Sequence, residues 1–197
     1  MLDLGIAAFG NDLVAAWRGF GTDDGLYYSS FNGSSWSGPT QIPGAGSTIG
    51  PSLAGFGGRL YAAWKGTDAG NALWYSSFDG SSWAPQAQIP GAGSSIGPTL
   101  RVGFGGRLYA AWKGSGSDEQ LWYSSFDGSN WAPQAQIPGA GSSIGPSLTV
   151  FKDTLYAAWR SNEGTNPSMG VSVSNVELWY SSFDGSSWAP QAPIPAG

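Results

Sequence analysis

The chain has 197 residues, which is enough for one domain with a sizeable core. It contains 32 Gly and 13 Pro, but 14% of its residues are aromatic, which argues against a disordered chain and favours a packed protein with many tight turns. The net charge of −5 argues against non-specific binding to nucleic acid or to an anionic membrane surface. The sequence has no Cys and no His, which excludes disulfides, thiol chemistry and histidine-based catalysis.

Targeting features are also lacking in the sequence. No apolar run reaches the length of a membrane-spanning helix, so we expect no insertion into a membrane. The N-terminus has neither a basic segment nor a long apolar segment, so we expect no signal peptide. The localisation stays open, because the absence of Cys does not fix the compartment.

The chain repeats one pattern four times. A Ser-Ser-Phe motif ends at Phe31, Phe78, Phe126 and Phe183, at spacings of 47, 48 and 57 residues. An Ala-Ala-Trp motif precedes it in each copy at spacings of 47, 48 and 47 residues, so the extra ten residues of the last repeat lie between its two motifs. The repeats therefore divide the chain at 1–48, 49–95, 96–143 and 144–197, with an inserted loop at 161–177.

Each repeat contains four strand-like runs, which in the second repeat lie at 49–56, 59–65, 73–78 and 83–89. The dipeptides Gly57-Gly58 and Asp79-Gly80 between the runs are strong signals for hairpin turns. Pro85 marks the fourth run as an edge strand, because Pro cannot donate a hydrogen bond to an inner strand. The third repeat has one residue more near Gly103, which predicts a β-bulge.

Four-stranded antiparallel units of this length, without helical periodicity, are typical of a β-propeller. We therefore predict an all-β chain that forms a single β-propeller domain over residues 1–197, with one blade per repeat. Each unit would begin with an inner strand and end with an outer one. Four repeats would close as one four-bladed ring, two chains would pair into an eight-bladed homodimer with two-fold symmetry, or the chain is part of a longer array. The repeat pattern does not choose among these.

The acidic residues offer little for catalysis. Asp79, Asp127 and Asp184 occupy hairpin turns, and turn formation explains them. The other acids lie mainly in loops between the second and third strands and are not matched from repeat to repeat. Because glycoside hydrolysis requires a positioned pair of carboxylates, we predict no enzyme activity and keep a glycoside hydrolase as the weaker alternative. No spacing of metal ligands is evident, so we expect no metal and no cofactor.

The hairpin segment 77–83 reads Ser-Phe-Asp-Gly-Ser-Ser-Trp and resembles the Asp-box of sialidase-type propellers. It departs from that motif in lacking the spacer residue between Asp and Gly. The Asp-box is itself a structural turn, so the resemblance does not imply sialidase activity. The arginine cluster and the catalytic tyrosine of sialidases have no recognisable counterparts in this sequence.

The repeats are more similar to those of bacterial and fungal propeller lectins, and to the fucose-binding lectins in particular. Those repeats read Leu-Trp, a short strand, and then Asp-Gly-Ser-x-Trp; here Leu73-Trp74 precedes 79–83, and Leu121-Trp122 precedes 127–131. The resemblance covers all four repeats but rests on short motifs. It implies sugar sites between adjacent blades that are built from Trp, from Arg or Lys, and from a carboxylate.

The topology of a blade places these residue types on one rim. The loop between the second and third strands lies beside the link to the next blade, and each repeat brings to this rim a Trp followed by Lys or Arg, and an aromatic residue at the start of the third strand. Aromatic faces stack on sugars, and charged groups bind their hydroxyls. We therefore predict that ligand is bound by Trp17, Arg18, Trp64, Lys65, Asp68, Trp74, Trp112, Lys113, Glu119, Trp122, Trp159, Arg160 and Trp179.

A structural interpretation competes with this one. Strand alternation aims Trp64 and its counterparts at the neighbouring blade, where they would serve as core residues, and the Lys and Arg side chains would then be solvated. Our preferred hypothesis is a non-catalytic, multivalent lectin for a glycan ligand, with its best sites in the second and third repeats. The alternative is an interaction scaffold or an engineered symmetric propeller without a natural ligand, which explains the near-identical repeats equally well.

Overall fold

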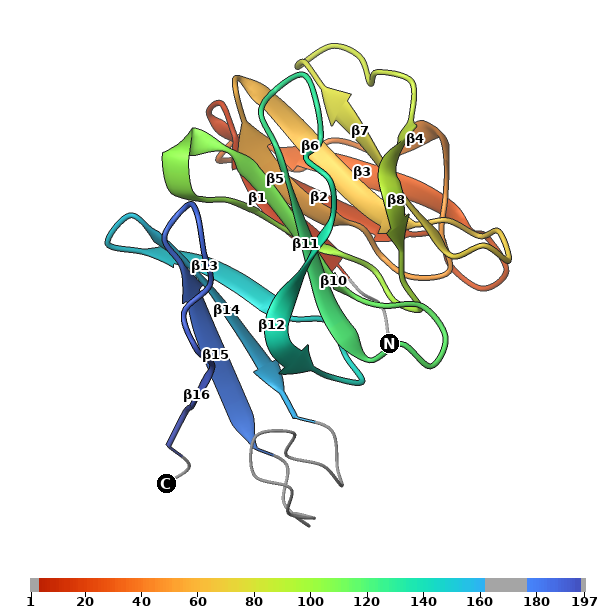
Figure 1. The fold of residues 1–197 in the computed structure, drawn as a ribbon. Coiled ribbons are helices and arrows are strands. Elements are labelled where there is room, and N and C mark those ends of the chain that lie inside the picture. Colours follow the sequence, from red (N-terminus) through yellow and green to blue (C-terminus); the bar gives the residue numbers. More distant parts are fainter. Residues whose placement is uncertain (1–3, 162–176, 196–197) are drawn as a thin grey trace.

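The structure is a computed structural model that describes residues 4–161 and 177–195. In these residues all the long elements are strands, and they form four antiparallel sheets of four strands each (Figure 1). Figure 1 shows the sheets following one another in sequence order, from red to blue. Each sheet coincides with one repeat, so the predicted all-β architecture of four four-stranded units is confirmed.

Each sheet is built from four consecutive strands. The first blade contains β1 (Leu4–Phe9), β2 (Asp12–Arg18), β3 (Gly25–Phe31) and β4 (Thr40–Gly46), and the second contains β5 (Ser52–Phe56), β6 (Arg59–Lys65), β7 (Ala72–Phe78) and β8 (Ala87–Gly93). The third contains β9 (Thr99–Val102), β10 (Leu108–Lys113), β11 (Gln120–Phe126) and β12 (Ala135–Gly141), and the fourth contains β13 (Ser147–Phe151), β14 (Thr154–Arg160), β15 (Leu178–Phe183) and β16 (Ala192–Pro193). Strand neighbours in sequence are also neighbours in space, so every blade is a β-meander.

The first strand of each blade is the innermost one. β1 lies beside β5, β5 beside β9, and β9 beside β13. These strands and the links that precede them border a central cavity of about 600 Å³, which is lined by residues such as Gly5, Leu53, Leu100 and Leu148. This arrangement confirms the predicted order of strands in a blade, from an inner first strand to an outer fourth strand.

In the described part of the chain the core consists of three apolar clusters, one between each pair of adjacent blades. We call the face that packs on the preceding blade the incoming face and the opposite face the outgoing face. In the cluster between the first two blades, the outgoing face of the first contributes Val14, Ala16, Leu26, Ile42 and Ala45, and the incoming face of the second contributes Leu53, Leu60, Ala62, Trp64 and Phe78. The other two clusters use the corresponding residues, so the chain builds the same interface three times.

The hairpin after the third strand anchors each interface at the edge of the blade. In the second blade Trp83 pairs with Phe78 in an isolated β-bridge, and their ring centroids lie 5.3 Å apart. Tyr28 of the preceding blade meets Trp83 edge-on at 5.5 Å, a geometry that aromatic pairs prefer. Ser76 is buried, and its hydroxyl donates a hydrogen bond of 2.6 Å to the carbonyl oxygen of Ala84. The Ser-Ser-Phe motif therefore fixes the hairpin to its own sheet.

The Asp of each hairpin holds the turn through its carboxylate. Asp79 Oδ1 accepts hydrogen bonds from the backbone N–H groups of Ser81 and Ser82, both at 2.9 Å, and these bonds hold the pKa of Asp79 far below its usual value. The same bonds lower the pKa of Asp127, and they lower the pKa of Asp184 to about 2. In the first blade Asn32 Oδ1 accepts the equivalent two bonds, at 2.9 and 3.0 Å.

These lowered pKa values predict a stability loss in acid. Each carboxylate stabilises the folded state above the unfolded-state pKa of about 3.9, and its contribution is lost as the pH falls through the lower folded-state pKa. The triple variant Asp79→Asn, Asp127→Asn, Asp184→Asn is therefore expected to show a smaller drop in Tm between pH 5 and pH 2.5 than the unmodified chain. The turns should persist, because Asn32 already forms one.

The matched control is Asp153→Asn, which changes a carboxylate in a different hairpin. Thermal unfolding followed by circular dichroism measures all three proteins at both pH values. A drop in Tm that is equal in the triple variant and the unmodified chain would contradict the assignment of acid sensitivity to these hairpins.

The structure corrects three details of the predicted strands. The first strand of the second blade begins at Ser52 and not at residue 49. The fourth strand of the second blade begins at Ala87 and not at residue 83, because residues 84–86 leave the sheet after the single bridge at Trp83. It continues through Pro90, where a register irregularity opposite Ala72 and Trp74 removes the need for a backbone donor.

The additional residue of the third repeat forms no bulge in β9. The pairing of β9 with β10 is regular from Thr99 to Val102, and the extra length is taken up by the 3₁₀ turn Phe104–Gly106. In the fourth repeat, residues 162–176 of the inserted loop lie outside the described residues. The two ends of that loop are joined, since Ser161 N donates to Glu177 O at 2.7 Å.

Candidate functional site

Two polar pockets lie between adjacent blades on the rim that carries the loops between second and third strands. The pocket between the first and second blades has a volume of about 190 Å³ and is lined by Gly44, Gly46, Trp64, Gly66, Thr67, Asp68, Trp74 and Gln86. The pocket between the second and third blades has a volume of about 280 Å³, and its lining includes Gly91, Gly93, Trp112, Ser115, Asp118, Trp122 and Gln134. The two linings correspond closely, so the chain builds one kind of pocket twice.

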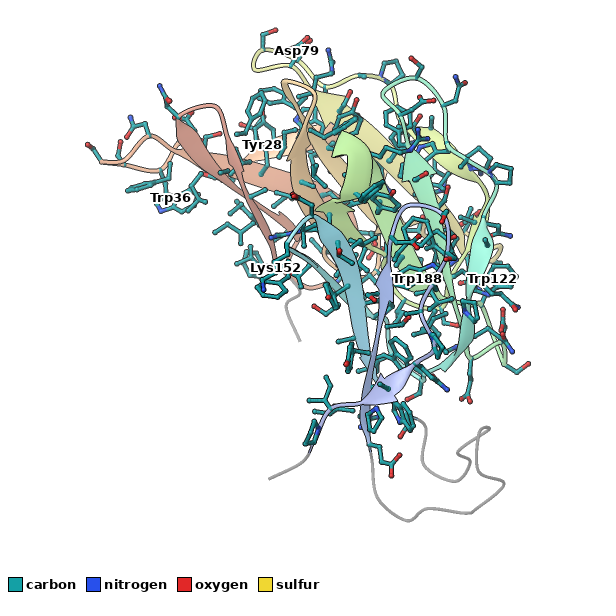
Figure 2. The ribbon with its side chains drawn as sticks, turned by 60° about the vertical axis from the view of Figure 1, so that its left-hand side comes forward. Tyr28, Trp36, Asp79, Trp122, Lys152 and Trp188 are labelled. Atoms are coloured by element: carbon teal, nitrogen blue, oxygen red, sulfur yellow. The ribbon has the colours of Figure 1, made fainter. Side chains whose placement is uncertain are left out.

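The larger pocket presents a carboxylate against an indole. Asp118 Oδ2 accepts a hydrogen bond of 2.9 Å from Trp122 Nε1, and Asp118 Oδ1 accepts one of 3.0 Å from the backbone of Gln120. Both side chains are half-buried, so each keeps part of its surface exposed to solvent. Figure 2 shows Trp122 on the outer part of its blade. The pair forms a rigid wall that combines an aromatic surface with a negative charge.

The amide of Gln134 lies against the end of β8, the fourth strand of the preceding blade. A Cβ atom on Gly91 would lie 3.6 Å from Gln134 Nε2, and the corresponding atom on Gly44 would lie 3.8 Å from Gln86 Nε2. The amides of Gln86 and Gln134 therefore lie within van der Waals reach of the fourth strand of the preceding blade. Since an amide both donates and accepts hydrogen bonds, it adds the neutral polar group of the pocket.

The structure places three carboxylates at equivalent positions of three blades, although these residues do not align in the sequence. Asp23 follows Gly19 by four residues, Asp68 follows Gly66 by two, and Asp118 follows Gly114 by four. In all three blades the carboxyl group lies where a Cβ atom on that Gly would collide with it. Three loops of different spacing thus place an acid at one position beside the aromatic residue of the third strand.

In the first blade this aromatic residue is Tyr27. Its hydroxyl donates a hydrogen bond of 2.9 Å to Asp23 Oδ2, and this bond raises the pKa of Tyr27. The pair Asp23–Tyr27 is the counterpart of Asp118–Trp122. It has no preceding blade beside it among the described residues.

The cations that the sequence proposed for ligand binding make contacts within the protein. Lys113 is buried, and its ammonium group donates to Ser95 Oγ, Gly114 O and Gly116 O at 3.4, 3.2 and 3.1 Å. Lys65 donates to Gly66 O at 3.2 Å, and Arg160 donates to Ser143 Oγ at 3.3 Å. These side chains hold the rim loops in place. Lys113 and Arg160 also bind the segment that joins the preceding blade to their own.

The fourth cation, Arg18, is paired with an acid. It forms an ion pair with Asp24 Oδ1 at 2.6 Å and also donates to Gly21 O. Neither Arg18 nor Asp24 lines the two pockets.

The proposed tryptophans divide into three groups. Four of them are buried in the interfaces between blades: Trp64, Trp112, Trp159 and Trp179. Trp64 and Trp112 also border the pockets, although they are almost fully buried. Trp74 and Trp122 are half-buried and line the pockets beside their acids. Trp17 lies on the incoming face of the first blade, in an apolar hollow that is separate from both pockets.

Four predicted residues lie away from the two pockets. Glu119 is exposed and does not line the pocket, where its neighbour Asp118 stands instead. Trp159, Arg160 and Trp179 border the inserted loop, whose residues 162–176 lie outside the described part of the chain.

Sequence reasoning missed Asp118, Gln86 and Gln134. The two glutamines belong to the repeated Trp-Ala-Pro-Gln phrase, and this repetition was the signal that would have found them. For Asp118 the available signal was the recurrence of an acid a few residues after the Gly that follows the Trp-Lys pair. The unequal loop spacing concealed that recurrence.

Comparison with known proteins identifies the fold. No protein-family model matches the chain, and no curated protein matches it by sequence. Solved structures do match. A protein of unknown function from Dyadobacter fermentans has a TM-score of 0.68 and 14% identity over 98% of this chain and 68% of its own.

Two other matches have named activities. A xylan beta-1,4-xylosidase from Bacillus halodurans has a TM-score of 0.63 and 14% identity, covering 99% of this chain and 42% of its own. A mutant of the Aleuria aurantia lectin in complex with alpha-methyl-L-fucoside has a TM-score of 0.63 and 18% identity, covering 99% of this chain and 62% of its own. The chain spans about two fifths of the length of the xylosidase.

The fold is that of a β-propeller. Identities of this size show the fold alone, so the function rests on the pockets themselves. Within residues 4–161 and 177–195, no three acidic side chains are placed to hold a metal ion. The same residues contain no helix of the length and apolarity that a membrane span requires.

Proposed function

We propose that this propeller is a non-catalytic carbohydrate-binding protein, and that the pockets between its blades each hold one sugar. The observation that carries the proposal is the pair of Asp118 and Trp122, joined by a hydrogen bond of 2.9 Å at the entrance between two blades. In the pocket between the first two blades, Asp68 and Trp74 are the corresponding lining residues. Two equivalent sites in one chain would give the protein avidity for a surface that displays many copies of a glycan.

The chemistry of the pocket suits a sugar hydroxyl group. The carboxylate of Asp118 accepts hydrogen bonds, the amide of Gln134 both accepts and donates them, and the exposed part of the Trp122 indole offers an apolar surface to a sugar ring. A volume of about 280 Å³ is at the lower end for ligand sites, so we expect a single sugar residue to fill it. Lys113 is excluded from direct contact in this proposal, because its donors are occupied by the protein.

A glycoside hydrolase is the second candidate, because the xylosidase shares this fold. Hydrolysis by the usual mechanism requires two carboxyl groups about 5–9.5 Å apart. Each pocket between blades has one acidic side chain in its lining, and the described lining of the central cavity has none. These observations support binding without cleavage.

The proposal is tested by screening glycans and then measuring affinity by isothermal titration calorimetry. Asp68→Asn together with Asp118→Asn is expected to weaken binding about tenfold or more, because a hydrogen bond to a charged group contributes about 1.5–3 kcal/mol. Trp74→Ala together with Trp122→Ala is expected to abolish binding while circular dichroism stays unchanged.

Glu119→Gln is the matched control for Asp118→Asn, since it removes the adjacent charge outside the pocket, and its affinity should equal that of the unmodified protein. Two results would overturn the proposal: no glycan bound at millimolar concentration, or release of sugar from an aryl glycoside that is lost in the Asp68→Asn, Asp118→Asn variant.

A further inference from the structure

The fourth blade exposes a face that is buried in every other blade. Leu178 occupies the same register position as Leu26, Leu73 and Leu121, opposite the cation that ends the second strand. Those three leucines are 0% exposed, whereas Leu178 is 50% exposed. Ile194 is 37% exposed, although its counterparts Ile42, Ile89 and Ile137 are at most 1% exposed. The outgoing face of the fourth blade, which includes Phe151, Leu178, Tyr180 and Ile194, therefore lacks the blade that would cover it.

The first blade exposes the opposite face. Leu13 is 36% exposed, while its counterparts Leu60, Leu108 and Leu155 are at most 1% exposed. Trp36 is 49% exposed, and Figure 2 shows it at the outer edge of its sheet, whereas Trp188 lies within the packed region. An apolar hollow of about 510 Å³ opens on this incoming face and is lined by Leu4, Ala15, Trp17, Phe20, Ser29, Trp36, Ser37 and Pro39.

These two faces remain open because the four blades do not close on one another. Among the inner strands, β1, β5, β9 and β13 are neighbours in that order, but β13 makes no comparable contact with β1. The ends of the arc therefore carry one outgoing face and one incoming face. These are the two halves of the interface that the chain forms three times internally.

We propose that a second copy of this chain covers these faces, with the outgoing face of its fourth blade packed on the incoming face of the first blade. The occupant follows from complementarity: the surface that fits an incoming face in this protein is an outgoing face, and each chain leaves one of each exposed. The contact would continue the existing series of blade interfaces. This inference is independent of the proposed sugar sites.

The internal interfaces predict how the two copies meet. Tyr28, Tyr75 and Tyr123 each meet the hairpin Trp of the following blade edge-on, at 5.5, 5.5 and 5.3 Å. Trp36 packs on its own Phe31 at 5.3 Å, and no Tyr among the described residues meets it edge-on. We expect Tyr180 of the second copy to take this place and Leu178 to enter the hollow beside Trp17.

A head-to-tail contact of this kind either closes into a ring or continues as an open filament. Two copies supply eight blades, which is the upper end of the range common among propellers, while three copies would supply twelve. The closed product that we infer is therefore a two-chain ring with two identical interfaces related by a two-fold axis.

Analytical ultracentrifugation tests the inference on the whole chain. The unmodified protein is expected to sediment with twice the mass of the 20.4 kDa chain. Leu178→Asp, which places a charge on the outgoing face, and Trp36→Asp, which places one on the incoming face, should each give a monomer. Gln136→Asp adds the same charge to an exposed position of the third blade and should leave the two-chain mass unchanged. Circular dichroism checks that each variant is folded.

Mixing the two monomeric variants makes the test specific for head-to-tail contact. The Trp36→Asp chain keeps an intact outgoing face and the Leu178→Asp chain keeps an intact incoming face, so the mixture is expected to regain one interface and form a two-chain species. A monomeric unmodified protein, an assembly of three or more chains, or a mixture that stays monomeric while the unmodified protein pairs would overturn the inference.

Discussion

Trp112→Ala is expected to lower the free energy of unfolding by about 3–5 kcal/mol, the usual cost of removing a buried Trp. Trp112 is 0% exposed and lies in the cluster between the second and third blades, where it packs with residues of both sheets. The substitution would leave a cavity that two β-sheets cannot close by moving one side chain. Because the cluster joins two blades, the substitution is expected to destabilise both of them.

Trp17→Ala is the matched control, since Trp17 has the same position in the first blade but lies on the uncovered incoming face. Its cost is expected to be about half as large or less, because the surface removed is already partly in contact with water. Both changes are best compared in the Leu178→Asp background, where pairing of chains cannot cover Trp17. Urea unfolding followed by circular dichroism gives the two free energies, and equal losses would contradict a core located between blades.

Gly5→Ala is expected to destabilise the protein by about 2–3 kcal/mol through overpacking. A Cβ atom on Gly5 would collide with the carbonyl oxygen of Pro51, which belongs to the backbone entering the second blade. Because a backbone oxygen cannot rotate away, the first two inner strands would have to separate. This separation would also loosen the cluster that contains Leu53.

Gly38→Ala is the control for this change. Nothing lies within 4 Å of a Cβ atom on Gly38, and its backbone is not in the left-handed region. The free energy of unfolding of the Gly38→Ala variant is expected to stay the same or to rise by less than about 1 kcal/mol, because Ala restricts the unfolded chain. Thermal unfolding of both variants measures the difference. A Tm for Gly5→Ala at or above that of Gly38→Ala would contradict the close approach of the blades.

The repeat made the architecture predictable. Strand alternation and the turn pairs located the second and third strands almost to the residue, as β6 at Arg59–Lys65 shows. The turn at Gly57-Gly58 was predictable because two consecutive residues with positive φ favour Gly, and both residues have positive φ. The prediction of the fourth strand was less accurate, because Pro85 and Pro90 carry conflicting signals that only the bulge near Trp74 resolves.

The candidate site was predictable only in part. Of the predicted residues, Asp68, Trp74 and Trp122 line the two pockets, and their role in binding a ligand stays a prediction. The role of Lys113 was not predictable, because its three backbone and hydroxyl acceptors come from loops whose paths are set by packing. Asp118 was missed because loops of unequal length place their acids at equivalent positions in different blades.

The open ends of the arc were also beyond a sequence-based argument. The repeats at the ends use nearly the same letters as those in the middle, so Leu178 and Leu73 look alike in the sequence. Whether each is covered depends on the number of blades and on the curvature of the stack. Both are properties of the whole assembly and not of any one repeat.

The threefold use of one interface has a consequence for how such a chain changes over generations. Because any outgoing face fits any incoming face, a gene duplication that adds one whole repeat creates a new junction of the existing kind. In repeat proteins, stability is close to a sum of unit and nearest-neighbour contributions, so such an insertion adds a junction without disturbing the others. The number of repeats can therefore vary while the residues that form each interface between blades stay the same.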